Sequence, residues 1–303
     1  MNSKSVSTLH LTLLKDSTGS LSRGKIAELK HLSKTDCFIE TGTYLGNTTD
    51  AMRPLFSRVV SIELSEELHA AAQKRFAGDS VVSLIRGDSA ERIVDALALG
   101  GESRPLIWLD AHWSGGNTAK AGRNTPILAE IHRIKEAGRS DAMILVDDIS
   151  FFWKVNPGFN VHDSISGYPE ISMLMDELMA LNPTFKIFVN CDIMVAVPAE
   201  LMGDTVISPV LEATSRLRTG QYSAEELTFL ESTVAEAVGE ERETIIGLPN
   251  YFAHALSYGV GGHFCYWRGL VMAQDGKFAE AGRDFNVARS CGIRRARRQW
   301  EKD

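Results

Sequence analysis

The stretch Cys37–Thr49 constrains the fold of this chain more than any other. It reads Cys-Phe-Ile-Glu-Thr-Gly-Thr-Tyr-Leu-Gly-Asn-Thr-Thr, so a short apolar run ends in an acid, and Gly42 and Gly46 precede a possible helix start. Glycine is needed where the backbone turns sharply or where a ligand approaches it closely. Free N–H groups at a helix start favour a ligand with acidic or polar oxygens. The pattern predicts a strand, a tight turn and a helix around a nucleotide-type cofactor, although such a turn alone is often only a turn.

Apolar runs alternate with helical patterns from this stretch to residue 197. Strands that alternate with helices of this length indicate a parallel sheet covered by helices on both faces. We therefore expect an α/β fold with a doubly wound, mostly parallel seven-stranded sheet that ends in an antiparallel hairpin. The strands are expected at 38–40, 59–63, 81–85, 105–109, 142–146, 185–190 and 193–197, and the helices at 22–32, 47–56, 66–76, 89–99, 126–137 and 171–181.

The same patterns divide the chain into three parts, which are an N-terminal helical segment at 1–34, the α/β domain at 35–200 and a C-terminal all-α module at 201–303. The first residues are polar apart from an apolar patch at Leu9–Leu14, and we expect a frayed end or a small helix there. After Pro198 the strand pattern stops, and helical patterns follow at 206–220 and 224–238.

Within the C-terminal module, Phe264–Gly292 resembles a single tetratricopeptide-type helical hairpin. Gly269 stands at the small position of the first helix, and Gly276-Lys277-Phe278 forms the turn. One such unit cannot bury both of its faces alone. We interpret it as a packing module, with a homodimer contact as one possible use, rather than as a peptide-binding array.

The composition argues against several classes of protein. A net charge of −7 and a pI of about 5.7 do not favour general binding to nucleic acids or anionic membranes. Four scattered cysteines without a Cys-x-x-Cys pair indicate neither a zinc site nor a disulfide framework, and they favour reduced thiols and a cytoplasmic location. No apolar run approaches the ~20 residues of a membrane span. The basic run at 294–298 is interpreted as a solvated last helix.

Acidic residues recur where the predicted strands end. Ligands of such sheets bind beyond the carboxyl ends of the strands. One acid there is a common capping residue, but several on one edge repel each other unless a ligand or cation lies among them. This acidic edge therefore predicts a positively charged ligand. Its members are Glu40, Glu63, Asp88, Asp110, Asp147 and Asp148.

The spacing of the glycines and acids discriminates between cofactors. A ribose needs an acid at the end of the second strand, roughly 20 residues after the glycine turn, and Glu63 meets this requirement. The Gly-x-Gly-x-x-Gly pattern of dinucleotide sites is absent, and a carboxylate at Glu40 would repel a pyrophosphate. Both observations disfavour a nicotinamide-dependent oxidoreductase. They favour S-adenosylmethionine, which carries an ammonium and a sulfonium.

The stretch Glu40–Thr49, together with Glu63 and Gly87-Asp88, resembles the Rossmann-fold S-adenosylmethionine-dependent methyltransferases. Its form is most similar to the cation-dependent O-methyltransferases that act on catechols and macrolide sugars. The resemblance covers roughly residues 35–198 and does not include the helical module. It implies cofactor contacts from Glu40, Gly42, Thr43, Tyr44, Gly46, Thr48, Glu63, Asp88, Ser89 and Asp110.

Within that set the resemblance implies different roles. Glu40, Gly42 and Gly46 would lie near the methionine moiety, Glu63 would hold the ribose hydroxyls, and Asp88 would contact the adenine edge. The alternative for Asp88 is an N-cap of the helix that begins at the next residue.

The resemblance also implies a divalent cation, Mg2+ or a similar ion, held by Asp110, Asp147 and Asp148. His112 stands where the family often has an acid, and Asp148 where it often has Asn. A cation between a hydroxyl and these carboxylates would lower the pKa of the hydroxyl. His112 and Asp110 are the expected catalytic residues, with His112 accepting the proton because an imidazole titrates near 6.5. The alternative is that His112 is a structural residue of the edge.

Two long loops are expected on the same edge. Residues 113–125 are predicted to form a mobile lid, and residues 150–168 carry Phe151, Phe152 and Trp153, which could stack on a ring or pack on the sheet. The sequence thus predicts an S-adenosylmethionine-dependent methyltransferase that acts on hydroxyl groups of a small molecule or saccharide. The alternative from another class is a non-catalytic interaction protein whose helical module binds a partner.

Overall fold

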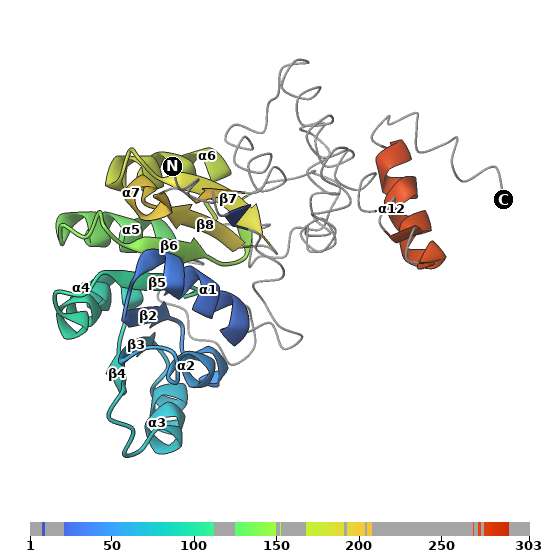
Figure 1. Ribbon diagram of the computed structural model, residues 1–303. Coiled ribbons are helices and arrows are strands. Elements are labelled where there is room, and N and C mark those ends of the chain that lie inside the picture. Colours follow the sequence, from blue (N-terminus) through green and yellow to red (C-terminus); the bar gives the residue numbers. More distant parts are fainter. Residues whose placement is uncertain are drawn as a thin grey trace, which may run out of the picture.

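The computed structural model describes residues 8–9, 21–111, 125–149, 152, 168–190, 193–203, 205–207, 269, 272–273 and 276–290. A seven-stranded sheet in the order β4-β3-β2-β5-β6-β8-β7 forms its centre (Figure 1). Its strands are β2 (Cys37–Thr41), β3 (Arg58–Glu63), β4 (Val82–Arg86), β5 (Pro105–Leu109), β6 (Met143–Val146), β7 (Lys186–Asn190) and β8 (Ile193–Val197).

The strand order confirms the predicted doubly wound α/β fold. The chain runs outward from β2 through β3 to β4 and then returns to β5 on the other side of β2, and all of these pairings are parallel. The switch between β2 and β5 is where ligands of such sheets bind. The predicted hairpin of β7 and β8 is present, and β8 lies antiparallel between β6 and β7.

Helices cover both faces of the sheet. They are α1 (Arg23–Ser33), α2 (Asn47–Met52), α3 (Glu66–Arg75), α4 (Ser89–Gly100), α5 (Ile127–Glu136), α6 (Ile171–Leu181) and α7 (Ala199–Met202). One apolar cluster joins the sheet to α4, α5 and α6, and a second joins its other face to α1, α2 and α7. Figure 1 shows α4 and α5 on the opposite side of the sheet from α1.

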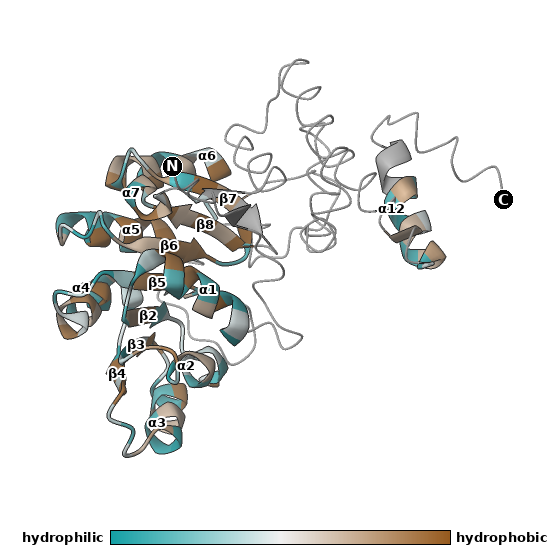
Figure 2. Ribbon diagram, viewed as in Figure 1, coloured by the Kyte–Doolittle hydropathy of each residue, from teal (hydrophilic) through white to brown (hydrophobic). Residues whose placement is uncertain are grey.

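Side chains of β2 alternate between the two clusters. Cys37 and Ile39 belong to the first cluster and Phe38 to the second. Because both faces are buried, β5 and β6 are continuous apolar runs instead of alternating ones. The strands are accordingly mainly hydrophobic in Figure 2, whereas α1 presents hydrophilic residues. The strands were recognisable in the sequence because burial on both faces leaves continuous apolar runs.

Two short strands differ from the expectation. β1 (Thr8–Leu9) pairs in parallel with β9 (Val206–Ile207). A frayed end or a small helix was predicted for the first segment, and a longer helix for the second. A two-residue strand is too short to show a period of two, and its pairing depends on a partner far away in the sequence. The remaining helical predictions at 208–220 and 224–238 lie outside the described residues.

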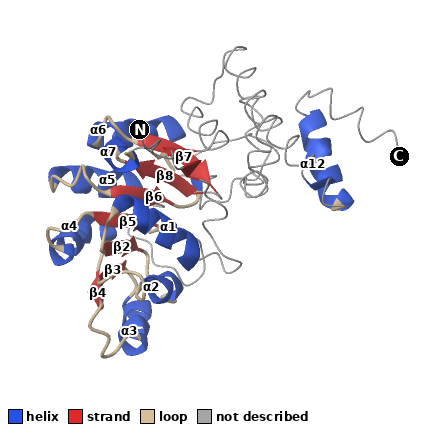
Figure 3. Ribbon diagram, in the orientation of Figure 1, coloured by secondary structure: helices blue, strands red, loops and turns tan. Residues whose placement is uncertain are grey.

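The described part of the C-terminal module is a helical hairpin. Residues 269 and 272–273 are helical, a turn follows at 276, and α12 (Phe278–Ser290) comes next (Figure 3). A Cβ on Gly269 would lie 2.7 Å from the ring of Phe285, so the two helical segments approach each other closely. The tetratricopeptide identity of this hairpin stays a prediction. None of the described helices is both long and apolar enough to cross a membrane.

Candidate functional site

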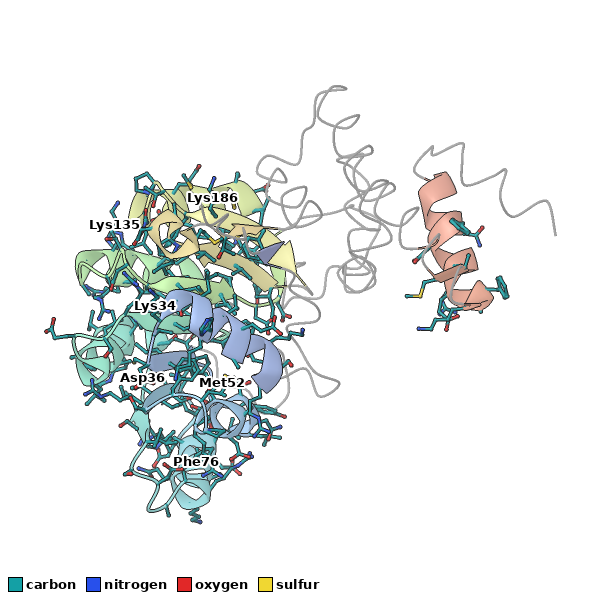
Figure 4. All side chains as sticks on the ribbon, in the orientation of Figure 1. Lys34, Asp36, Met52, Phe76, Lys135 and Lys186 are labelled. Carbon is teal, nitrogen blue, oxygen red and sulfur yellow. The ribbon has the colours of Figure 1, made fainter. Side chains whose placement is uncertain are left out.

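The loop after β2, residues 42–46, stands at the switch point of the sheet. Gly42 has φ 86°, and its N–H donates to the carbonyl oxygen of Ile62 at 2.9 Å. A Cβ there would lie 2.7 Å from the backbone oxygen of Asp110. Gly46 has φ 77°, and a Cβ would lie 2.8 Å from the ring of Phe76, which Figure 4 labels just after α3. The protein itself therefore requires both glycines, whether or not a ligand is bound.

The tip of this loop is exposed but held in place. Tyr44 has φ 48° and is 51% exposed, and the neighbouring Leu45 is exposed as well. The Nη1 of Arg75 donates to the Leu45 carbonyl oxygen at 2.5 Å and to Asn47 Oδ1 at 2.9 Å. The Arg75 guanidinium also lies over the Phe76 ring, with its Cζ 5.4 Å from the ring centroid. Arg75 thus connects the loop to the end of α3.

Glu63 ends β3 beside the same loop. It is 6% exposed, and its Oε2 accepts from the backbone N–H of Tyr44 at 2.8 Å, while its Oε1 accepts from Ser65 N–H at 2.8 Å. A carboxylate has about four acceptor positions, so these two bonds fix its orientation and use half of them. The others suit two neighbouring hydroxyl groups, as in a ribose. Ser65 also caps α3, because its Oγ accepts from the N–H of Leu68 at 3.3 Å.

Glu40 has a different environment from the one expected. It is 1% exposed, and its Oε2 accepts from the hydroxyls of Thr49 and of Ser61, the latter at 2.7 Å. Burial, with a smaller contribution from the charges of Asp110 and Glu63, raises the pKa of this carboxyl to about 8, although the two hydroxyl bonds act in the opposite direction. Glu40 is therefore mostly protonated at pH 7.

This protonation corrects one part of the sequence argument. A neutral Glu40 neither repels a pyrophosphate nor attracts an ammonium by its charge. The case against a dinucleotide cofactor now depends on the missing third glycine alone. A glutamate in a strand pattern does not reveal its protonation, because that depends on how completely the folded chain buries it.

Asp110 and Asp147 follow adjacent strands, as predicted. The N–H of Asp110 donates to the Thr41 carbonyl oxygen at 3.2 Å, and the N–H of Asp147 donates to the Leu109 carbonyl oxygen at 3.0 Å, so both continue the sheet ladder. Asp110 Oδ2 accepts from the indole Nε1 of Trp108 at 3.2 Å. Asp147 Oδ1 accepts from the N–H of Asp148 at 2.8 Å, and Asp148 has φ 51°.

The predicted metal site is not assembled by these aspartates alone. Within the part of the chain that the structure describes, no group of three or more His, Cys, Asp or Glu side chains is placed to hold a metal ion. Asp110, Asp147 and Asp148 thus do not form such a group, and His112 lies outside the described residues. The metal stays a prediction, and no chemical step is derived through it.

Asp88 has the structural role that the sequence offered as an alternative to cofactor binding, namely that of a helix N-cap. Its Oδ1 accepts from the N–H of Ala90 at 3.0 Å, so it is the N-cap of α4. Thr43, Thr48 and Ser89 are all nearly buried. Their contacts with a cofactor, like the adenine contact of Asp88, stay predictions.

The acidic edge exists, but its electrostatics are milder than expected. The members lie at the carboxyl ends of β2 to β6, where the parallel ladder places them. However, protein groups donate hydrogen bonds to carboxyls of this edge, among them those of Glu40, Glu63, Asp88, Asp110 and Asp147. Mutual repulsion therefore does not by itself demand a cationic ligand.

Sequence reasoning missed several residues of this region. Ser61 interrupts the apolar run of β3 and lies directly opposite Glu40 in the register. Thr49 and Trp108 are the donors to two of the acids, and Arg75 restrains the loop. Ser61 was the one signal in the sequence that could have indicated this network. A polar residue inside a buried strand normally forms a hydrogen bond with another buried group.

The two predicted loops are hardly represented among the described residues. Thr125 alone is described from the predicted lid, and its Oγ1 accepts from the N–H of Ile127 at 3.4 Å. From 150–168 the structure describes Phe152 and Tyr168, which are buried and meet edge to face with ring centroids 5.1 Å apart. Phe152 thus packs in the core, as its alternative stated, while Phe151 and Trp153 lie outside the described residues.

Comparisons with known proteins show likeness in structure only. No protein-family profile matches the chain, and no curated protein matches it in sequence. The O-methyltransferase TomG from Streptomyces achromogenes, in complex with S-adenosylmethionine, is 16% identical, with 57% of this chain and 77% of that chain covered and a TM-score of 0.40. An O-methyltransferase from Bacillus cereus in complex with S-adenosylhomocysteine is 17% identical, with 57% and 78% covered and a TM-score of 0.40.

A third structure is that of the methyltransferase PaMTH1 from Podospora anserina, bound to S-adenosylhomocysteine. It is 17% identical, with 58% of this chain and 76% of that chain covered and a TM-score of 0.39. At such low identity and TM-score, the likeness carries no argument about activity. The activity of this chain has to be argued from its own residues.

Proposed function

We propose that this chain is an S-adenosylmethionine-dependent methyltransferase. The observation that carries the proposal is the orientation of Glu63. Two backbone N–H groups fix its carboxylate beside the glycine loop, at the switch point of a doubly wound sheet. An acid in this position accepts the hydroxyl hydrogens of a ribose, and the loop lacks the third glycine of dinucleotide sites.

The finer proposal is methyl transfer to an oxygen of a hydroxylated small molecule or saccharide. When bound, S-adenosylmethionine supplies a methyl group on a sulfonium. The chain would orient the hydroxyl and remove its proton. His112 is the proposed acceptor of that proton, and it follows Ala111, whose N–H donates to Thr41 Oγ1 at 3.3 Å. The Trp108–Asp110 bond fixes a carboxylate two residues before it.

A divalent cation is a separate part of the proposal. Asp110 and Asp147 are the carboxylates that would hold it, but the described side chains do not complete a set of ligands. Turnover in excess EDTA tests this point separately. Full activity there would leave the methyltransferase proposal intact and remove the cation from it.

Calorimetric titration with S-adenosylhomocysteine tests the main proposal. The wild-type chain should bind it, and Glu63→Ala should weaken binding at least about tenfold, because a buried acceptor pair is lost. Glu66→Ala is the matched control, since Glu66 is exposed and pairs with Arg86. No binding by the wild type, or unchanged affinity in Glu63→Ala, contradicts the proposal.

A second candidate is a non-catalytic interaction protein. It is favoured by the hydrogen bonds that protein groups donate to carboxyls of the acidic edge and by the close packing of the C-terminal hairpin at Gly269. Such a protein would transfer no methyl group, so release of S-adenosylhomocysteine in a turnover assay separates the two candidates. Homodimer formation through this module and a cytoplasmic location remain predictions.

A further inference from the structure

A buried hydrogen-bond network joins the glycine loop to the sheet beneath it. Glu40 Oε2 accepts from the hydroxyls of Thr49 and Ser61, and Thr43 Oγ1 lies 2.6 Å from Ser61 Oγ. Ser61 and Thr49 are fully buried, Thr43 is nearly so, and Glu40 is 1% exposed. Four polar side chains therefore share one water-poor volume, where each hydrogen bond is costly to lose.

The register of the sheet explains why these groups meet. Glu40 and Ser61 are direct partners across the parallel pair β2–β3, so their side chains lie on the same face. This is the face that α1 and α2 cover, because Phe38 and Val59, two residues earlier on each strand, belong to that apolar cluster. Thr49, in the first turn of α2, completes the network by donating its hydroxyl to Glu40 Oε2.

The hydrogen bonds have a defined direction. A hydroxyl carries one proton. Since Ser61 donates its proton to Glu40, the bond between Thr43 and Ser61 must be donated by Thr43. The order is Thr43 to Ser61 to Glu40, with Thr49 donating to Glu40 from the other side. Glu40 thus receives restraints from the first part of the loop and from the helix that follows it.

A displaced loop would also affect Glu63. Tyr44 follows Thr43 directly, and its N–H is the donor to Glu63 Oε2. If Thr43 loses its anchor, this donor moves, and the ribose acceptor loses one of the two bonds that orient it. The network therefore affects both the glycine loop and the proposed ribose acceptor, Glu63.

On the basis of the proposed function, we propose that Glu40 is a positioning residue of the cofactor loop. It acts through Thr49, Ser61 and Thr43 on the conformation of residues 42–47, and it does not contact the cofactor. This differs from the direct contact with the methionine moiety that the sequence resemblance implies.

Two ligands distinguish the two roles. S-adenosylhomocysteine has an amino-acid part, whereas 5′-methylthioadenosine shares its adenine, ribose and thioether but lacks that part. Calorimetry with both ligands is performed on the full chain and on Glu40→Ala, Glu40→Gln and Ser61→Ala. Thermal unfolding of each variant monitors the fold.

A positioning role predicts parallel losses for the two ligands. Glu40→Ala should weaken both by a similar factor of about ten, and Ser61→Ala, which leaves the carboxyl in place, should weaken both by about threefold to tenfold. Glu40→Gln should restore most of the affinity for both, because the amide oxygen can still accept the two hydroxyl bonds. If Glu40→Ala does not fold, Ser61→Ala and Glu40→Gln still decide the matter.

Other outcomes overturn the inference. A loss for S-adenosylhomocysteine alone, in Glu40→Ala or Glu40→Gln, would show direct contact with the amino-acid part. Unchanged affinities in Ser61→Ala would show that the network does not hold the loop. If the wild type binds neither ligand, the proposed function fails and the inference fails with it, which is a different result from either of these.

Discussion

The backbone N–H of Tyr44 donates to Oε2 of Glu63 at 2.8 Å, which joins the exposed tip of the glycine loop to the buried end of β3. Tyr44 adopts φ 48°, a conformation that costs a non-glycine residue about 1 kcal/mol or more. The rest of the loop supports this conformation through Arg75 on its outer side and the Glu40 network beneath it. Glu63, the proposed hydrogen-bond acceptor for the ribose, and the glycine loop are therefore structurally coupled, so that a change in one should displace the other.

Neutralising Glu63 tests this coupling without removing the volume of the side chain. Glu63→Gln should weaken binding of S-adenosylhomocysteine about tenfold, because an amide offers one acceptor oxygen and places an NH2 group against a backbone N–H. Glu66→Gln, three residues further along and exposed, should bind like the wild type. Equal affinities of the two variants in calorimetry would contradict the role of Glu63.

Substitution of Gly42 tests how closely the loop approaches Asp110. A control glycine separates the cost of the positive φ from the cost of the clash between the added Cβ and the backbone. Gly42→Ala combines φ 86° with a Cβ 2.7 Å from a backbone oxygen, and we expect the free energy of unfolding to fall by roughly 3 kcal/mol. Gly78→Ala is the control, since Gly78 has φ 81° but nothing within 4 Å of the added Cβ. Its expected loss is about 1 kcal/mol.

Chemical denaturation of both glycine variants measures these losses. Similar values for Gly42→Ala and Gly78→Ala would mean that the backbone near Asp110 yields easily. In that case the close approach of the loop to β5 would not be a constraint on the site.

The fold was predictable from sequence because burial on both faces leaves a strong local signal. Runs such as Pro105–Leu109 are apolar at every position, and the helices between the strands have recognisable apolar periods, with caps at Ser65 and Asp88. The position of β8 between β6 and β7 was not predictable, since local patterns show that two strands form a hairpin but not which of them meets the existing sheet. The pairing of β1 with β9 depends on contacts across most of the chain.

The candidate site was predictable in position but less so in chemistry. The ends of parallel strands place Glu63, Asp110 and Asp147 on one edge without any knowledge of side chains. The protonation of Glu40 and the cap formed by Asp88 depend on which donors surround them after folding. A strand pattern does not contain that information.

The pKa of Glu40 predicts a pH dependence of stability. Its value rises from an ordinary 4.5 to about 8, so the folded chain retains a proton that the unfolded chain releases between these pH values. The contribution of this group to the free energy of unfolding is therefore largest below about pH 4.5, and it falls as the pH rises to about 8. A single proton changes that free energy by at most about 1.4 kcal/mol per pH unit.

Urea unfolding of the wild type and of Glu40→Gln between pH 5 and pH 8.5 measures this contribution. The amide cannot titrate, so the variant should lack the fall in stability that Glu40 causes. Glu66→Gln, which removes an exposed carboxyl, should keep it. Parallel curves for the wild type and Glu40→Gln would show that Glu40 is ionised in the folded chain.

Trp108 links the core to the proposed chemistry. Its side chain is fully buried on the α1 side of the sheet, and its indole N–H donates to Asp110 Oδ2 at 3.2 Å. Trp108→Phe removes this donor and leaves a ring in the core, so the chain should fold with a loss of about 1–3 kcal/mol. If the bond orients Asp110 beside the hydroxyl that receives the methyl group, kcat should fall several-fold, while the affinity for S-adenosylhomocysteine changes little.

Phe38→Leu is the control for stability alone. It shortens a side chain in the same apolar cluster and removes no hydrogen bond. A loss of kcat in Trp108→Phe no greater than in this control would mean that the orientation of Asp110 does not limit turnover.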